Sequence, residues 1–151
     1  MQTDEQSAGQ GAIGSDSVDH DGAGVDRRVS KLAEVSREMV RIYKDQFGRG
    51  PTKARSDFAG PDLVIVTLED TLTPAEKRMA QLGDHQRLRD LRLYFQHVTE
   101  EQFCEVIERV LDRKVRAFIS GMDTEQDVAA ELFYLQSREA EDPGAASFPE
   151  T

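Results

Sequence analysis

The stretch LVIVTLEDTLTPAE, residues 63–76, decides the fold that the sequence predicts. Its first half is apolar at successive positions, which is typical of a strand that is covered on both faces or lies at the centre of a sheet. Its second half holds the start of a helix. Thr73 can cap that helix, Pro74 suits the first helical position, and Glu76 stands three residues after the cap. The stretch therefore predicts a central strand at about residues 62–69 and a short helix directly after it.

Upstream of this stretch, apolar residues at helical spacing predict a helix that begins near Val29 and runs to about Phe47. Gly48 suits the left-handed position after a helix end, and Pro51 prevents the helix from continuing. A first strand is predicted at about residues 52–58, joined to the central strand by a short turn that contains a proline.

Downstream, the short helix is expected to end near Leu82, and a long periodic segment covers residues 85–112. We predict one continuous helix for this segment because its apolar phase is unbroken. Two further strands, at about 114–121 and 127–136, are joined by a polar turn. The predicted core face of the long helix consists of Leu88, Leu91, Phe95, Val98, Gln102, Val106 and Val110.

The order of the elements is α-ββ-αα-ββ, with strands paired by short turns. It predicts an α+β fold with two layers, in which a four-stranded antiparallel sheet carries its helices on one face. Apolar residues at 63–68 and 133–135 point to both faces of this sheet, and one layer of helices covers only one. We therefore expect a homodimer, or a complex with another protein, that buries the second sheet face or a helix flank.

The charge of the chain is concentrated at its two ends. The 151 residues carry a formal net charge of −10, of which residues 1–26 supply −6 and residues 137–151 supply −3. Both ends are poor in large apolar residues, so we expect them to be disordered tails around a single domain at 27–136. The domain itself is nearly neutral, which disfavours nucleic-acid binding because attraction to phosphates supplies most of its non-specific affinity.

The sequence also indicates a cellular location. Cys104 is the only cysteine, so no internal disulfide is possible. No run of 18 apolar residues occurs, and no basic region followed by an apolar stretch opens the chain. We expect a cytoplasmic protein without a membrane span or signal peptide.

Several motifs, taken in order, resemble those of a known family. They are FGRGP after the first helix, VIVTLEDTLTPAEK, the arginine-rich long helix, DRKVRAFISGMD and a final apolar strand. Together, over about residues 28–136, they resemble the MpsC family, which is named for a sodium-translocating system that generates membrane potential. The resemblance implies a small soluble component of a membrane system tied to sodium and inorganic-carbon uptake, and it implies no catalytic residues. The chain departs from the family pattern in its acidic N-terminal tail and at Ala129 and Ala130.

The Gly-Arg-Gly-Pro sequence at 48–51 is the first candidate site. A phosphate cradle needs glycines before a helix, where backbone N–H groups face the anion, whereas these glycines follow a helix. The spacing also differs from that of a P-loop. We interpret the motif as a helix stop, with one alternative: a loop in which Arg49, Lys53 and Arg55 bind an acidic partner or an anion.

The histidines give little support for metal binding or catalysis. His97, Glu101, Cys104 and Glu108 are spaced to share one stripe of the long helix, and such residues can hold a metal. One helix face with a single cysteine is a weak metal signal, so we expect a solvated or partner-facing surface. His85 has no evident serine or histidine partner for a catalytic triad. We therefore expect neither a cofactor nor an enzyme.

Arg87, Arg89 and Arg92 form a basic run that acidic residues interrupt. Ordinary helix-surface charge explains this run, and RNA binding is the alternative. The leading hypothesis is a non-catalytic accessory or regulatory module, peripheral to a membrane protein of an ion or bicarbonate transport system. A small sensor or enzyme that uses the Arg49 loop for an anion or metabolite is the second hypothesis.

Overall fold

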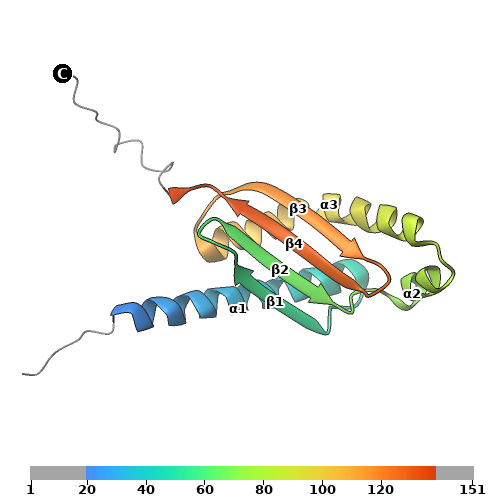
Figure 1. Cartoon of the computed structure of the whole chain (residues 1–151), viewed down its shortest axis with the longest axis horizontal. Coiled ribbons are helices and arrows are strands. Elements are labelled where there is room, and N and C mark those ends of the chain that lie inside the picture. The colour runs from blue at the N-terminus through green and yellow to red at the C-terminus, as the bar shows by residue number, and fades with distance from the viewer. Residues whose placement is uncertain (1–19, 139–151) are drawn as a thin grey trace, which may run out of the picture.

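The structure, a computed structural model, describes residues 20–138. Its elements follow the predicted order, α-ββ-αα-ββ, and form an α+β fold (Figure 1). The elements are α1 (His20–Phe47), β1 (Lys53–Phe58), β2 (Leu63–Glu69), α2 (Pro74–Gln81), α3 (His85–Leu111), β3 (Val115–Asp123) and β4 (Val128–Leu135).

The four strands form one antiparallel sheet in the order β1-β2-β4-β3. The apolar strand β2 therefore lies at the centre, as its sequence predicts. β4 crosses back to pair with β2, and this pairing places Val66 opposite Glu131. The next pairing outward places Glu131 opposite Ser120 on β3.

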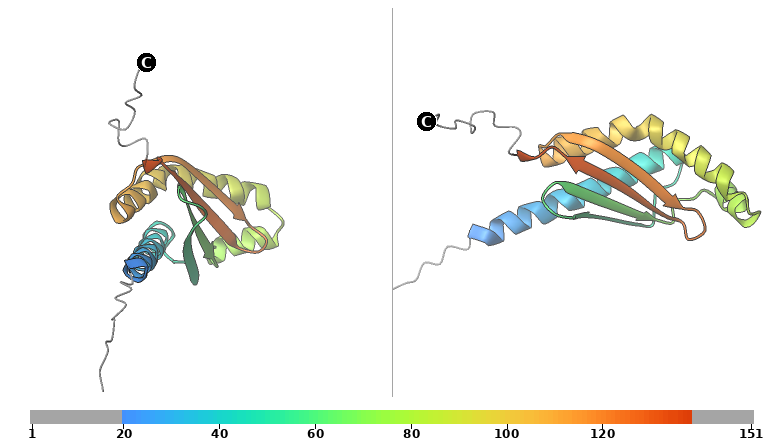
Figure 2. Two further views of the ribbon diagram at one scale, coloured as in Figure 1. Left: turned by 60° about the vertical axis from the view of Figure 1, so that its left-hand side comes forward. Right: turned by 45° about the horizontal axis from the view of Figure 1, so that its top comes forward.

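Helices α1 and α3 lie on the same face of the sheet, behind it in Figure 1 and seen from two other sides in Figure 2. Between the helices and the sheet lies the core, in which each fully buried large apolar side chain contributes about 1.5–3 kcal/mol. Its largest fully buried apolar side chains are Met39, Tyr43, Leu68, Phe103, Ile107, Phe133 and Leu135.

The opposite face of the sheet, here called the open face, is covered by no element of the described chain. Val64, Val66 and Leu68 on β2 are fully buried, while the alternate residues Leu63 and Ile65 are only half-buried. The open face carries the apolar residues Leu63, Ile65, Ala117, Ile119, Leu132 and Tyr134. A two-sided apolar strand therefore leads to an apolar surface, as the sequence predicts.

Helix α1 begins at His20 instead of near Val29. Its first turns extend past the sheet, and residues 22–30 are exposed (Figure 1). Residues 20–26, which the composition assigns to a disordered tail, are thus helical, because they continue a helix whose later turns are anchored in the core. The rest of the predicted tails, residues 1–19 and 139–151, lies outside the described residues.

Helix α3 is continuous, as predicted, but much of its predicted core face is wrong. Leu91 is exposed and Val98 is 58% exposed, whereas Arg92, Gln96 and Thr99 are buried. The N-terminal half of α3 packs over the Glu76 carboxylate of α2 and over the Phe47 ring of α1. The predicted core residues Leu88, Val106 and Val110 are buried. Phe95 is half-buried against the Phe47 ring, and Gln102 is exposed.

Candidate functional site

A dense group of polar contacts lies at the end of the sheet where β2 ends and α2 begins. Asp70 and Asp127 both adopt left-handed backbone conformations, with φ of 59° and 54°. The Asp70 N–H donates to the carbonyl of Asp127 over 3.0 Å. The Asp127 carboxylate in turn accepts from the N–H groups of Thr71, at 2.8 Å, and Leu72, at 3.1 Å. The turn before β4 thereby holds the loop that follows β2.

Arg49, from the Gly-Arg-Gly-Pro motif, fastens the end of α1 to this same loop. Its Nη2 lies 2.7 Å from an Asp70 carboxylate oxygen, and its Nη1 donates to the Leu72 carbonyl over 3.1 Å. Lys77 on α2 donates to the other Asp70 oxygen over 3.0 Å. Hydrogen bonding from Lys77, together with the charge of Arg49, lowers the pKa of Asp70. Gly48 has φ of 76°, as expected for a residue that ends a helix.

A buried ion pair lies directly beneath this loop. The Arg92 guanidinium of α3 donates from both Nε and Nη2 to the Glu76 carboxylate, and Nη2 also donates to the Thr71 carbonyl over 2.8 Å. Its carbon Cζ lies 3.9 Å from the centre of the Phe47 ring. Burial by itself raises the pKa of Glu76, but hydrogen bonds from Arg92 and Thr73 outweigh it, so the pKa is lowered.

The predicted capping box is present at the start of α2. Thr73 N–H donates to Glu76 Oε1 over 3.0 Å, and Glu76 N–H donates to Thr73 Oγ1 over 3.3 Å. One carboxylate therefore caps α2 and binds Arg92 at once. Asp84 occupies the matching position before α3, but its side chain makes no capping hydrogen bond and pairs with Arg87 at 3.4 Å.

A cleft of about 590 Å³ opens beside this group, between β1, α2 and the turn before β4. His85 contributes to its lining, and His85 Nδ1 lies 2.8 Å from Thr124 Oγ1. The sequence showed no hydroxyl partner for His85, because Thr124 is far away in the chain and only the fold brings the two together. Thr124 is 2% exposed, and no carboxylate contact to the His85 ring is present among the described residues. The pair therefore lacks the third group of a catalytic triad.

The three residues of the proposed anion-binding loop face three different carboxylates. Arg49 pairs with Asp70, as described above. Lys53 lies 3.6 Å from Glu69, and Arg55 lies 2.7 Å from Asp57. Lys53 and Glu69 are among the residues that line the cleft, so the cleft contains charges of both signs.

A second polar group is buried between the sheet and the helices. Glu131, at the centre of β4, is fully buried, and its Oε1 accepts from the Tyr43 hydroxyl of α1 over 2.7 Å. Its Oε2 and the hydroxyl of Ser120, its neighbour on β3, make no hydrogen bond among the described residues. Burial raises the pKa of Glu131 to about 7, although the hydrogen bond from Tyr43 and the charge of Arg92 favour the charged form. Neither Glu131 nor Tyr43 stands out in the sequence, because each sits within an apolar pattern.

The candidate metal ligands on α3 are not brought together. The His97 side chain is exposed and lies 3.8 Å from Glu100, not from Glu101. Cys104 is half-buried against the core, and burial with nearby carboxylates raises the pKa of its thiol to about 11. Among residues 20–138, no three histidine, cysteine or acidic side chains are grouped as metal ligands would be.

The basic run of α3 is divided between different environments. Arg87 pairs with Asp84, Arg89 is exposed, and Arg92 is buried in the ion pair with Glu76. Arg92 therefore does not belong to a basic surface.

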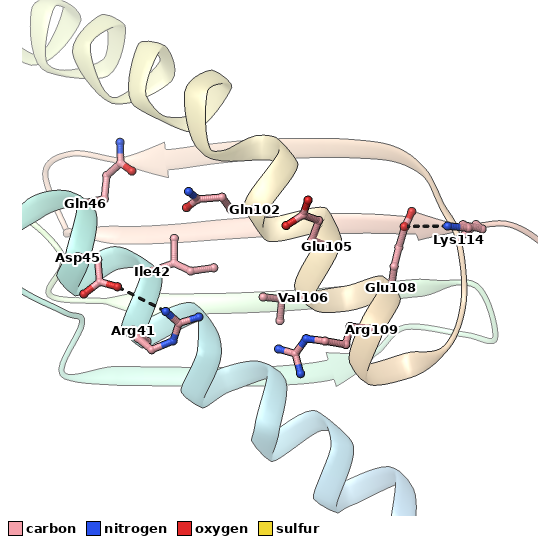
Figure 3. Close-up of a pocket in the computed structure, with 10 residues that line it drawn as sticks. All are labelled: Arg41, Ile42, Asp45, Gln46, Gln102, Glu105, Val106, Glu108, Arg109 and Lys114. Atoms are coloured by element: carbon pink, nitrogen blue, oxygen red, sulfur yellow. Dashed lines mark hydrogen bonds and ion pairs between the residues drawn. The ribbon is translucent and has the colours of Figure 1, made fainter.

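A groove of about 890 Å³ lies between α1 and α3 on the side away from the sheet (Figure 3). It is lined by three basic and three acidic side chains, several of which pair with one another. Arg41 lies 3.5 Å from Asp45, and Lys114 lies 3.3 Å from Glu108. The groove therefore offers no excess of one charge that would select a ligand.

Comparison with known proteins gives one family. The family model described as "Na+-translocating membrane potential-generating system (MpsC)" matches residues 27–137. Neither a curated protein nor a solved structure matches the chain. Within the described residues, no helix is both long enough and apolar enough to cross a membrane.

Proposed function

Because the chain belongs to the MpsC family, we propose that it is a non-catalytic accessory or regulatory module that acts by protein contact. The observation that carries the proposal is the reversed polarity of α3 in its N-terminal half. Leu91, Tyr94 and Val98, here called the outer stripe of α3, face solvent, with Tyr94 65% exposed. An exposed apolar stripe of this kind typically marks a protein-binding surface.

The open face of the sheet is the second surface that supports protein contact. Ile119 is 53% exposed and lies in one cross-strand row with Leu132 and Ile65. We infer that a second copy of the chain covers one of these two surfaces, because a self-complementary apolar patch is the usual basis of a two-fold dimer. A membrane protein of the system would then bind the other surface.

The family description names a system that translocates Na+ and generates membrane potential. A module that binds such a system from the cytoplasmic side fits a chain whose described helices are too polar to cross a membrane. Regulation of sodium or bicarbonate transport by this contact is part of the proposal.

Size-exclusion chromatography with light scattering tests whether the chain forms a dimer, and variants identify the surface through which the two copies associate. We expect a dimer at tens of micromolar for the wild-type chain. Val98→Lys disrupts it if the outer stripe is the dimer surface, and Ile119→Lys disrupts it if the open face is. Glu105→Lys, an exposed change on α3, is the matched control that leaves the mass unchanged. A monomer at all concentrations contradicts the homodimer.

The membrane partner is tested by capture of the full-length chain with its interacting proteins from its own cells. We expect a membrane transport protein in the captured material. Of Val98→Lys and Ile119→Lys, the variant on the surface that the dimer does not use should no longer capture this transport protein. Capture that is equal for Val98→Lys, Ile119→Lys and the wild-type chain contradicts contact through either surface.

A role as an anion or metabolite sensor has one supporting observation, the cleft beside Lys53, Lys77 and His85. A thermal-shift screen against bicarbonate, nucleotides and phosphorylated metabolites tests it. Lys53→Ala is the informative variant, because Arg49→Ala also removes a contact that holds the fold. A specific shift that Lys53→Ala abolishes favours the sensor over the contact module.

A further inference from the structure

A basic hollow lies at the root of the part of α1 that extends past the sheet. It measures about 730 Å³ and is bounded by α1, by the turn between β1 and β2, and by the chain after β4. Among the described residues that line it, Asp62 is the one acid, and it already accepts a hydrogen bond from Arg113. Its basic lining residues are Arg27, Arg28, Lys31, Arg113 and Arg138.

Most of this positive charge is uncompensated. Arg27, Lys31 and Arg138 make no ion pair with the side chains of residues 22–138, and Arg28 lies over the Phe58 ring at 5.2 Å. Arg113 is committed to structure, since it also donates to the carbonyls of Pro61 and Gln136. With respect to the described side chains, three basic groups are thus available to an acidic ligand.

The walls of the hollow also contain apolar surface, from Phe58, Pro61 and Leu111. A ligand that suits these walls combines carboxylates with an apolar side chain. A small inorganic anion would satisfy the charges alone, whereas an acidic peptide would satisfy both.

We propose that this hollow binds the chain's own acidic C-terminal segment, residues 139–151. The segment leaves directly from Arg138, which lines the hollow, and carries Glu139, Glu141 and Asp142 at its start. An extended chain spans at most about 3.6 Å per residue, so Asp142 lies within about 14 Å of Arg138. The same segment holds Phe148, which can meet the apolar walls.

Attachment favours this occupant over a free one. A tethered segment is present at an effective concentration in the millimolar range, so contacts that are weak individually suffice. Exposed ion pairs contribute little each and are screened by salt. We therefore infer a reversible docking that covers the hollow at low ionic strength and that an acidic partner can displace.

Paramagnetic broadening in the full-length chain tests the docking. A nitroxide is attached to Ser147→Cys in a Cys104→Ser background, and the amide signals of residues 24–31 are followed at about 50 mM salt. We expect at least a twofold loss of peak height there, restored at about 500 mM salt. Arg27→Glu with Lys31→Glu should abolish the broadening. Arg37→Glu with Arg89→Glu, the same charge change at exposed positions elsewhere, should leave it intact.

A second measurement needs no label and leaves Cys104 unchanged. Replacing Glu139 and Glu141 by Gln, and Asp142 by Asn, should shift the amide signals of residues 24–31 relative to the wild-type chain. Signals that stay unchanged, or broadening that survives the Arg27 and Lys31 changes, overturn the proposal. Broadening seen only between separate labelled and unlabelled molecules overturns it too, because the segment then belongs to another copy. The proposal is also overturned if inorganic phosphate shifts the amide signals of residues 24–31 equally in the wild-type chain and in the variant that lacks the three tail acids.

Discussion

The protonation of the Glu131 carboxyl group depends on the residues that surround it in the fold. Glu131 occupies an inward-facing position in the alternating pattern of β4, so its side chain faces the core. There the Tyr43 hydroxyl is its one hydrogen-bond donor in the described part of the chain. An ionised carboxylate with a single hydrogen bond is costly in such a place, and protonation relieves the cost. The fold therefore contains a carboxyl group that holds its proton up to about neutral pH.

We predict that the stability of the chain falls as pH rises through the neutral range because of Glu131. Its pKa is about 7 when folded and near its ordinary value of 4.5 when unfolded, so the folded state binds more protons above pH 4.5. Linkage then lowers the free energy of unfolding by about 2–3 kcal/mol between about pH 5 and 8. Glu131→Gln should remove this slope and stabilise the chain at pH 8, as measured by urea unfolding. Glu101→Gln, on the surface, should retain the slope.

Arg92 is predicted to matter for stability far more than its neighbours on the basic run. Arg92→Ala leaves the buried Glu76 carboxylate unpaired, which should cost about 3–5 kcal/mol in urea unfolding. Arg89→Ala, one turn away and exposed, should cost less than about 0.5 kcal/mol. Equal losses for the two variants would show that the ion pair does not form.

At the scale of elements, local signals predicted where helices and strands begin and end, and tertiary contacts decided which side faces inward. The capping box at Thr73 and the helix stop at Gly48 are both present because they act within one turn of chain. The prediction of which face of α3 points inward was wrong for its N-terminal half. Periodicity identifies an apolar stripe, and in this half of the helix the apolar stripe lies on the outside. Arg92 and Gln96 are buried only because Glu76 and Tyr43, from other elements, lie beneath them.

The capping box gives a prediction at this scale. Thr73→Ala removes the side-chain acceptor at the start of α2 and should destabilise the chain by about 1 kcal/mol. Thr73→Ser keeps the hydroxyl and should restore most of the loss. The urea midpoint at constant slope measures both, and a Ser variant as unstable as the Ala variant would argue against a capping role.

At the scale of the whole molecule, the notable feature is apolar surface left on both sides of a two-layer fold. If a second copy buries one of these surfaces, folding and association are coupled by mass action. The melting temperature of the wild-type chain should then rise by about 3 °C for each tenfold increase in concentration. The variant that disrupts the dimer, Val98→Lys or Ile119→Lys, should lose this dependence. Scanning calorimetry measures it, and a constant melting temperature for the wild-type chain contradicts the coupling.

For the candidate sites too, the sequence shows some of the residues, and the fold decides which of them come together. Arg49, Lys53 and Arg55 were visible in the sequence as a basic loop. Arg55 pairs with Asp57 of the same strand. Glu69 meets Lys53 only through the pairing of β1 with β2, and Asp70 meets Arg49 only through closure of the loop after β2. The His85 and Thr124 contact and the basic hollow at Arg138 join segments far apart in the chain. No local sequence pattern predicts such sites, because their residues are not neighbours in the chain.

By itself, the sequence determined the order of the elements, the central place of β2 and the presence of apolar surface beyond what one helical layer covers. These follow from propensity, capping and alternation, which act over a few residues. Only the tertiary structure decided that α3 turns Arg92 inward and Tyr94 outward, and that Glu131 lies in the core. The physical reason is that burial of a polar side chain depends on the partner available to it, and that partner is supplied by another element.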